Sequence, residues 1–200
     1  SAHASDPHAV GPATAGSAGD ATLNAAANIT DDGSALTVLA ADVLTADAGG
    51  SVTLDTTVAS ADASTSAAGN IDIDETNAIV LSDVDTNDGS ITVDAGGQIT
   101  ATDVASLTDA DTNDISLTTT AGDIAVGTVT AGSAGDATLN AAANITDDGS
   151  GATVLAADDL IADAGGSVTL DTTVDSANVS TSAAGDIDID ETNAIVLSEV

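Results

Sequence analysis

Two short acidic segments carry the residue types best suited to bind a hard metal cation. Oxygen-bearing side chains crowd both segments, at Asp83, Asp85, Asn87, Asp88, Asp109, Asp111, Asn113 and Asp114. Carboxylate and amide oxygens are the ligands that Ca²⁺ takes in proteins, so these residues are candidate Ca²⁺ ligands. The EF-hand pattern fits poorly, because an alignment from Asp83 puts Asp88 where glycine is required and Asp94 where glutamate is usual. The alternative is a solvated acidic turn, since Asp and Asn favour turns through local hydrogen bonds.

The composition leaves these carboxylates without cationic partners in the chain. There are 33 acidic residues and neither Lys nor Arg, so the formal net charge is −33, and only His3, His8 and the amino terminus can become positive. Close carboxylates are therefore relieved only by bound or diffuse cations, since exposed charges about 5 Å apart repel by roughly 1 kcal/mol. Nucleic acids and anionic lipids require clustered Lys and Arg, so we expect neither as a partner. The longest purely apolar run, residues 78–81, is too short for membrane insertion.

A third acidic cluster, Asp72, Asp74 and Glu75, could supply the two carboxylates of a glycoside hydrolase. Sugar-binding enzymes usually add aromatic rings and Arg, and polysaccharide lyases need cations to neutralise a uronate, whereas this chain has no Phe, Trp, Tyr, Lys or Arg. The cluster also recurs as Asp188, Asp190 and Glu191, which fits a structural repeat better than one active site. We therefore expect no catalytic residues and no enzymatic activity. The chain has no Cys, which excludes disulfides and thiolate metal sites.

A long repeat sets the organisation of the chain. Residues 9–84 return as residues 125–200 without insertion or deletion, and 11 of the 76 aligned positions differ, so 65 match. Near-identical long repeats indicate an array in which each unit is stabilised by its neighbours. We divide the chain into an unpatterned leader, 1–8, which we expect to be flexible; a first long repeat, 9–124; and an incomplete second one, 125–200.

A shorter period lies inside the long repeat. Apolar-polar-apolar triplets begin at Ala21, Val52, Ile71, Ile91, Ile115, Ala137, Val168 and Ile187. Such alternation, with Val, Ile and Thr enriched and Gly-Gly or Asp-Gly between runs, predicts short strands joined by turns. Most spacings are close to the one from Ile71 to Ile91. The intervals that start at Ala21 and at Ala137 are longer, and they call for an extra loop or strand through residues 36–44 and their copy.

These periods predict an all-β fold, a parallel β-helix (β-solenoid) with coils of about 20 residues inside the 116-residue long repeat. Eight triplets correspond to about eight coils and a rod roughly 40 Å tall, at the usual interstrand spacing. In-register stacking would align the outward residues Thr22, Thr53, Asp72, Thr92 and Ser116. An ice-binding face would need an unbroken threonine array, and Asp72 interrupts this one, so β-propensity and charge spacing explain it better.

Segments such as GSITV (89–93), AGGQIT (95–100) and TTTAGDIAV (118–126) carry a recognisable style of repeat. It resembles the filamentous-haemagglutinin-type β-helix repeats of very large bacterial surface and secreted adhesins. The resemblance covers nearly all of the chain after residue 8. It implies the parallel β-helix fold and an extracellular or cell-surface location.

The function expected from the sequence is structural. We expect a stiff, soluble segment of an extracellular filament, stalk or adhesin, without sites for trypsin-like proteases because Lys and Arg do not occur. Its expected partners are further repeats of the same chain, or copies of itself stacked head to tail into a fibre. No cofactor is required in this hypothesis. One alternative is a Ca²⁺-dependent adhesion module that holds a glycan or a surface; another is a surface protein adapted to high salt by its acidity.

Overall fold

The computed structural model describes residues 2–4, 8–10, 13–15, 18–31, 39–147, 149 and 154–199 of the 200-residue chain. All regular secondary structure in these ranges is β-strand, and none of it is a helix that could span a membrane. The strand pairings are parallel, as the sequence predicts.

Short strands follow one another along the whole described chain. The first eleven are β1 (Ala2–Ala4), β2 (His8–Val10), β3 (Ala13–Thr14), β4 (Ala21–Ala25), β5 (Ile29–Asp31), β6 (Leu39–Ala40), β7 (Val43–Ala48), β8 (Val52–Thr57), β9 (Ser60–Ala68), β10 (Ile71–Glu75) and β11 (Ile79–Asp88). The remaining strands are β12 (Ile91–Ala95), β13 (Ile99–Ala101), β14 (Val104–Ser106), β15 (Ile115–Thr119), β16 (Ile124–Val126), β17 (Thr128–Thr130), β18 (Ala137–Ala141), β19 (Ile145–Asp147), β20 (Val154–Ala164), β21 (Val168–Thr181), β22 (Ile187–Glu191) and β23 (Val196–Glu199).

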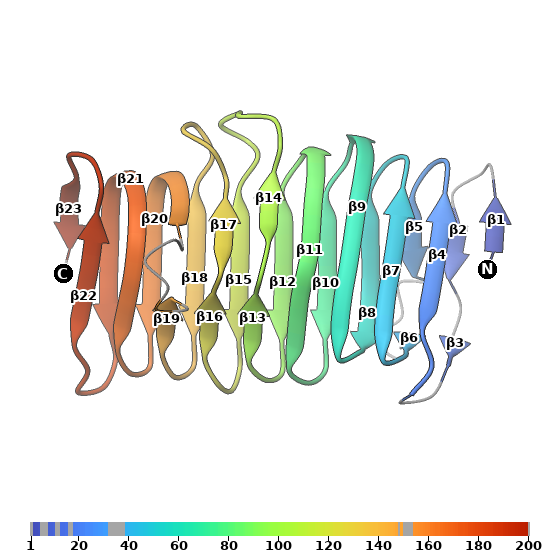
Figure 1. Cartoon of the computed structure of the whole chain (residues 1–200), viewed down its shortest axis with the longest axis horizontal. Coiled ribbons are helices and arrows are strands. Elements are labelled where there is room, and N and C mark those ends of the chain that lie inside the picture. Colours follow the sequence, from blue (N-terminus) through green and yellow to red (C-terminus); the bar gives the residue numbers. More distant parts are fainter. Residues whose placement is uncertain are drawn as a thin grey trace.

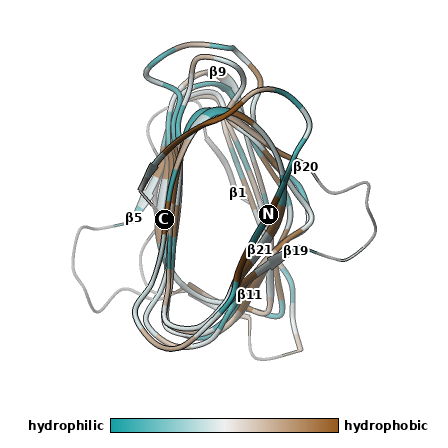
Figure 2. Ribbon diagram, turned by 90° about the vertical axis from the view of Figure 1, so that its left-hand side faces the viewer, coloured by the Kyte–Doolittle hydropathy of each residue, from teal (hydrophilic) through white to brown (hydrophobic). Residues whose placement is uncertain are grey.

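The strands stack as the coils of one β-solenoid, whose axis is the long axis of the molecule (Figure 1). The coils form a flattened ring with two long sides when seen along that axis (Figure 2). On one of these, named the Ile71 side, the stacked positions are Ile29, Val52, Ile71, Ile91, Ile115, Ala137, Leu160, Ala177 and Leu197. The series contains eight steps, the longest from Ile91 to Ile115 and the shortest from Leu160 to Ala177, which confirms the predicted coil size and number.

The opposite side, named the Leu81 side, carries two adjoining ladders. One passes through Ala21, Leu44, Ala61, Leu81, Ala101 and Val126, and the other through Ile79, Ile99, Ile124, Ile145, Val168 and Ile187. Each coil therefore consists of two half-coils, one on each side, joined by turns.

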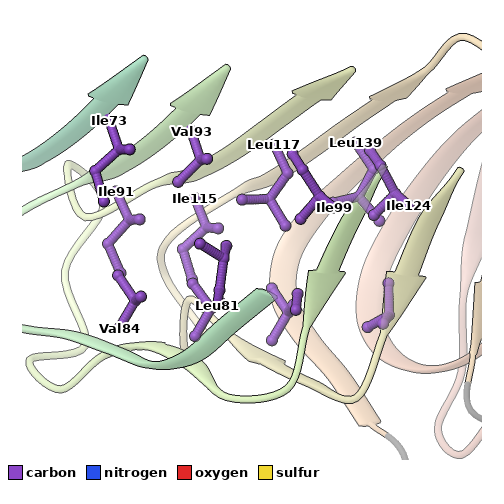
Figure 3. Packing of buried hydrophobic residues seen from close by; sticks show 14 of the residues in the cluster. Ile73, Leu81, Val84, Ile91, Val93, Ile99, Ile115, Leu117, Ile124 and Leu139 are labelled. Carbon is purple, nitrogen blue, oxygen red and sulfur yellow. The ribbon is translucent and has the colours of Figure 1, made fainter. Parts of the chain in front are cut away.

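Alternate side chains of the strands fill a narrow core between the two sides. Ile91 and Ile115 enter it from one side, and Ile99 and Ile124 from the other, all with no exposed area (Figure 3). Burying a side chain of this size stabilises the fold by about 1.5–3 kcal/mol. The core forms a single cluster that runs through both copies of the long repeat. Alanines alternate with larger residues at many stacked positions, which keeps the two sides close together.

The predicted column of outward-facing residues is present except for its first residue, Thr22. Thr53, Asp72, Thr92 and Ser116 do stack in register on the Ile71 side. Thr22 instead pairs with Thr45 on the Leu81 side, so the prediction was wrong for Thr22. The reason is that Ala21 and Val52 are one and a half coils apart: the chain completes one coil between Ala21 and Leu44, and it then crosses to the other side.

The extra strand expected between Ala21 and Val52 is present as β6, which lies inside the predicted range 36–44, and β7 begins at the end of that range. Residues 36–38 of the range lie outside the described residues. We also expected residues 1–8 to be an unpatterned, flexible leader. The described residues of that segment form β1 and the first residue of β2, and these strands pair with β4 and β5. The solenoid stack therefore includes them.

Candidate functional site

The first candidate Ca²⁺ segment lies within strand β11. Val84 and Thr86 point into the core, so the alternation of the strand turns Asp83 and Asn87 outward, where both are exposed. Asp85 and Asp88 are half-buried. The second segment, 109–114, lies in the connection between β14 and β15, where Asp109, Asp111 and Asp114 are exposed. The structure thus places one acidic segment on a strand and the other in a loop.

The two segments meet through one amide. Asn113 is only 2% exposed, and its Nδ2 donates hydrogen bonds to Asp88 Oδ1 at 2.9 Å and to the Thr108 carbonyl oxygen at 2.8 Å. Thr108 Oγ1 donates to the Asn87 carbonyl oxygen at 2.6 Å. These bonds attach the 109–114 loop to the coil before it. The amide oxygen of Asn113 and one oxygen of Asp88 remain possible cation ligands, but the amide nitrogen is committed to the loop contact.

Asp109 binds the following coil. Its Oδ1 accepts hydrogen bonds from the Ser133 and Ala134 backbone N–H groups at 2.9 and 2.8 Å, and its Oδ2 accepts one from Ser133 Oγ at 2.7 Å. The Ser133 hydroxyl, followed by the two backbone N–H groups, lowers the pKa of Asp109 below its ordinary value. Asp114 Oδ1 likewise accepts from the Asp136 backbone N–H at 3.0 Å. Asp109 and Asp114 therefore attach this loop to the next coil.

Within the described residues, no group of three or more His, Cys, Asp or Glu side chains is placed to hold a metal ion. The structure joins Asp88 to Asn113 but directs Asp109 and Asp114 toward the next coil. A Ca²⁺ site at these residues remains a prediction.

A column of aspartates on the Ile71 side was not singled out by the sequence analysis. Asp55, Asp74 and Asp94 are in register in three successive coils, about 4.8 Å apart by the normal strand spacing. They line a shallow groove of about 360 Å³, together with Thr76 and Thr120. Partial burial, and then the charges of Asp72 and Asp94, raise the pKa of Asp74. The sequence signal was an Asp directly after three successive triplets, in VTLD, IDID and ITVD.

Like charges crowd the Leu81 side as well. Burial raises the pKa of Asp62, with further contributions from Asp83 and Asp47. Asp85 also has a raised pKa, because of burial and then of Asp83 and Asp103. Both sides of the rod thus carry carboxylates that are less acidic than usual, and both favour protons or cations nearby.

The most buried carboxylate of the described residues is Glu75, which is 4% exposed. Its Oε2 accepts hydrogen bonds from Thr56 Oγ1 and the Val58 backbone N–H, both at 2.8 Å, and its Oε1 accepts one from the Asn77 backbone N–H at 2.9 Å. Glu191 makes the equivalent bonds to Thr172, Val174 and Asn193 in the second copy. The available signal was the use of Glu in IDIDETN, in a chain whose other acidic residues are Asp except for Glu199.

Comparison with protein families, with curated proteins and with solved structures finds no match to this chain. The geometry of the described residues offers hydrogen-bonded carboxylates that join coils and in-register carboxylates that face solvent.

Proposed function

We propose that this chain is a structural segment of an extracellular or cell-surface filament, stalk or adhesin. The observation that supports the proposal most is the continuous stack of coils, in which eight successive steps keep the same parallel pairing over one uninterrupted core. Each coil is stabilised by the coils before and after it, as in other solenoid proteins, so length can be added without a change of fold. The resemblance to filamentous-haemagglutinin-type repeats points to the same role.

The polar groups of the coils support a mechanical role. Where the structure describes the chain, every buried side-chain nitrogen or oxygen has a hydrogen-bond partner. Many of these bonds cross from one coil to the next, as from Thr56 to Glu75 and from Ser133 to Asp109. Stretching or bending the rod would break such bonds together with the backbone ladder, which makes the stack stiff.

The proposed partners are further coils of the same kind, either in the same chain or in another copy stacked head to tail. Any open stack of parallel strands has unpaired backbone N–H and C=O groups at its ends, and another strand layer satisfies them. In this proposal the top of one coil stack binds the bottom of the next, and head-to-tail contacts of this kind can continue without closing. A fibre would grow in this way.

A second candidate function is a Ca²⁺-dependent adhesion module that binds a glycan or a surface. The in-register column Asp55, Asp74 and Asp94 favours it, because adjacent carboxylates at the strand spacing repel one another unless cations lie between them. In this alternative the cation contributes to binding, whereas in the first it only screens charge.

Negative-stain electron microscopy of the purified chain, in excess Ca²⁺ and in EDTA, tests the proposal. Rods or filaments of uniform width in both conditions would support the scaffold, and compact globular particles in both would contradict it. Rods that form only with Ca²⁺ would favour the adhesion module. Two Asp→Asn sets, at 55, 74 and 94 or at 83, 85 and 88, would then locate the cation. Rods restored equally by NaCl would indicate adaptation to high salt instead.

A further inference from the structure

The two copies of one sequence lie on opposite sides of the solenoid. Ile71–Glu75, with the sequence IDIDE, forms β10 and stacks between β8 and β12 on the Ile71 side. Ile187–Glu191, with the same sequence, forms β22 and stacks on the start of β21, on the Leu81 side. Strands β5 and β19, another pair of copies, are likewise seen on opposite sides of the ring in Figure 2.

Counting half-coils explains this exchange of sides. From Ala21, five full coils pass through Leu44, Ala61, Leu81 and Ala101 and end at Val126. The rest of the 116-residue repeat crosses to Ala137, which stacks on Ile115 on the Ile71 side. The long repeat therefore contains eleven half-coils, which is an odd number, and each copy begins on the side opposite to the one before it.

The exchange preserves the local surroundings. Thr30, Thr53 and Asp72 stack on successive coils of the Ile71 side. Their copies Thr146, Thr169 and Asp188 stack in the same order on the Leu81 side. The buried Glu75 and the half-buried Glu191 also keep equivalent hydrogen bonds on their two sides. The two half-coils are therefore interchangeable environments for the same sequence.

We infer that successive long repeats are related by a two-fold screw axis along the solenoid, so that the chain displays one polar surface patch alternately on its two opposite sides. The patch is the threonine-threonine-aspartate column just described, and its copies lie about 26 Å apart along the axis. This inference rests on the strand pairing and not on the proposed scaffold function.

Spin-label distances test the screw relation, and the chain has no native Cys to interfere with labelling. Thr53→Cys with Thr169→Cys places labels on opposite sides, whereas the control Thr53→Cys with Ile161→Cys places both on the Ile71 side, five coils apart. We expect about 24 Å for the control and a distance roughly 10 Å longer for the opposite-side pair. A Thr53–Thr169 distance within about 5 Å of the control would overturn the inference.

The number of streptavidin molecules bound per chain tests whether both sides of the rod are accessible to a bound protein at the same time. The same double-Cys chains are biotinylated and mixed with excess monovalent streptavidin, a protein wider than the control spacing. Two streptavidins should bind the opposite-side pair, on opposite edges of the rod in electron micrographs, and one should bind the control. Two on the same edge would refute the inference. If the Thr53 variants do not fold, a second set of variants repeats the comparison. The opposite-side pair is then Asp72→Cys with Asp188→Cys, and the same-side control is Asp72→Cys with Asn178→Cys.

Discussion

Glu75 shows how a carboxylate can be stabilised inside a chain that has no Lys or Arg. Three hydrogen-bond donors, from Thr56, Val58 and Asn77, surround its two oxygens. These hydrogen bonds satisfy the carboxylate oxygens without a cationic partner. Thr56 and Glu75 lie in adjacent coils, so the bonds also join those coils.

We predict that Glu75→Gln lowers the free energy of unfolding by about 1–3 kcal/mol. An amide can accept hydrogen bonds on one of its two terminal atoms only, and its NH₂ group would face a backbone N–H. The measurement is urea unfolding followed by circular dichroism. Glu191→Gln is the matched control, and its effect should be smaller because Glu191 is only half-buried. Equal losses in both variants would contradict the role of burial.

Asp74 shows the opposite situation, a carboxylate whose ionisation is disfavoured. Its pKa is raised by partial burial, and then by the neighbouring charges of Asp72 and Asp94. We predict that Asp74→Asn raises the thermal midpoint at pH 7.5 by roughly 1–2 °C, a small gain because the side chain is largely exposed.

The gain in Asp74→Asn should shrink as the pH falls toward 4, where the wild-type carboxyl is itself protonated. Asp190→Asn is the control: this copy of Asp74 pairs with Asp171 and with no second acidic residue of the described chain. A gain at Asp190 as large as at Asp74 would argue against repulsion along the column as the cause. Differential scanning fluorimetry is sensitive enough for this comparison.

At the scale of elements, adjacent glycines permit close packing of the turns between β7 and β8. A Cβ at Gly49 would lie 2.0 Å from the Ala26 carbonyl oxygen, which is backbone of the preceding coil. A Cβ at Gly50 would instead lie 2.2 Å from the side-chain oxygen of Asn28, and the next nearest atom, Asn28 Cγ, would be 3.4 Å away. The first contact is with a rigid group, and the second with a side chain that can rotate away.

We therefore predict that Gly49→Ala destabilises the turn more than Gly50→Ala does. Gly49→Ala must separate two coils and should cost about 1–3 kcal/mol, the range of overpacked sites. Gly50→Ala should cost about 1 kcal/mol, for the lost hydrogen bond from Ser51 N–H to Asn28 Oδ1. Native-state hydrogen exchange of the Ile29 and Val52 N–H groups, which donate to the Ser51 and Asn70 carbonyl oxygens of adjacent coils, measures the local opening. Greater loss of protection in Gly50→Ala would contradict this assignment.

The strands themselves could be predicted from sequence because the triplets alternate and turn residues separate them, as at Ile71 and Ile91. The side on which each strand lies could not, because half-coils of both sides begin alike, with Ile at β10 and again at β11. The alternation of apolar and polar residues determines which side chains of a strand face the core. It does not indicate whether that strand lies on the Ile71 side or the Leu81 side. Contacts such as Asp109 with Ser133 depend on the stacking of successive coils, so local patterns did not indicate them.

At the scale of the whole molecule, the net charge of −33 acts against the compact stack. The charge is divided between the two sides, and hydroxyl-bearing residues separate some of the carboxylates, as Thr53 and Thr92 flank Asp72. Ser64 Oγ and Ser180 Oγ donate hydrogen bonds to Asp47 and Asp163, which satisfies these carboxylates across coils. The remaining repulsion is relieved by protons or by ions in solution.

The pH dependence of stability should therefore be inverted relative to most proteins. The raised pKa values of Asp62, Asp72, Asp74 and Asp85 mean that the folded chain binds more protons than the unfolded chain just above pH 4. Stability should then rise as the pH falls from 7 through these pKa values, and the gain should be complete near the unfolded value of about 3.9. Asp109, whose pKa is lowered, opposes this only below that value.

We predict a higher thermal midpoint at pH 5 than at pH 7.5, measured by calorimetry above the isoelectric point of about 4.1 so that the chain stays soluble. Repeating the scans in 1 M NaCl separates the two causes, since salt shortens the screening length to about 3 Å and removes repulsion but not burial. The pH dependence should weaken in salt without vanishing, because burial is the largest cause of each raised pKa. A midpoint that falls on acidification at low salt would show that carboxylate hydrogen bonds like those of Asp109, and not repulsion, dominate the stability of the rod.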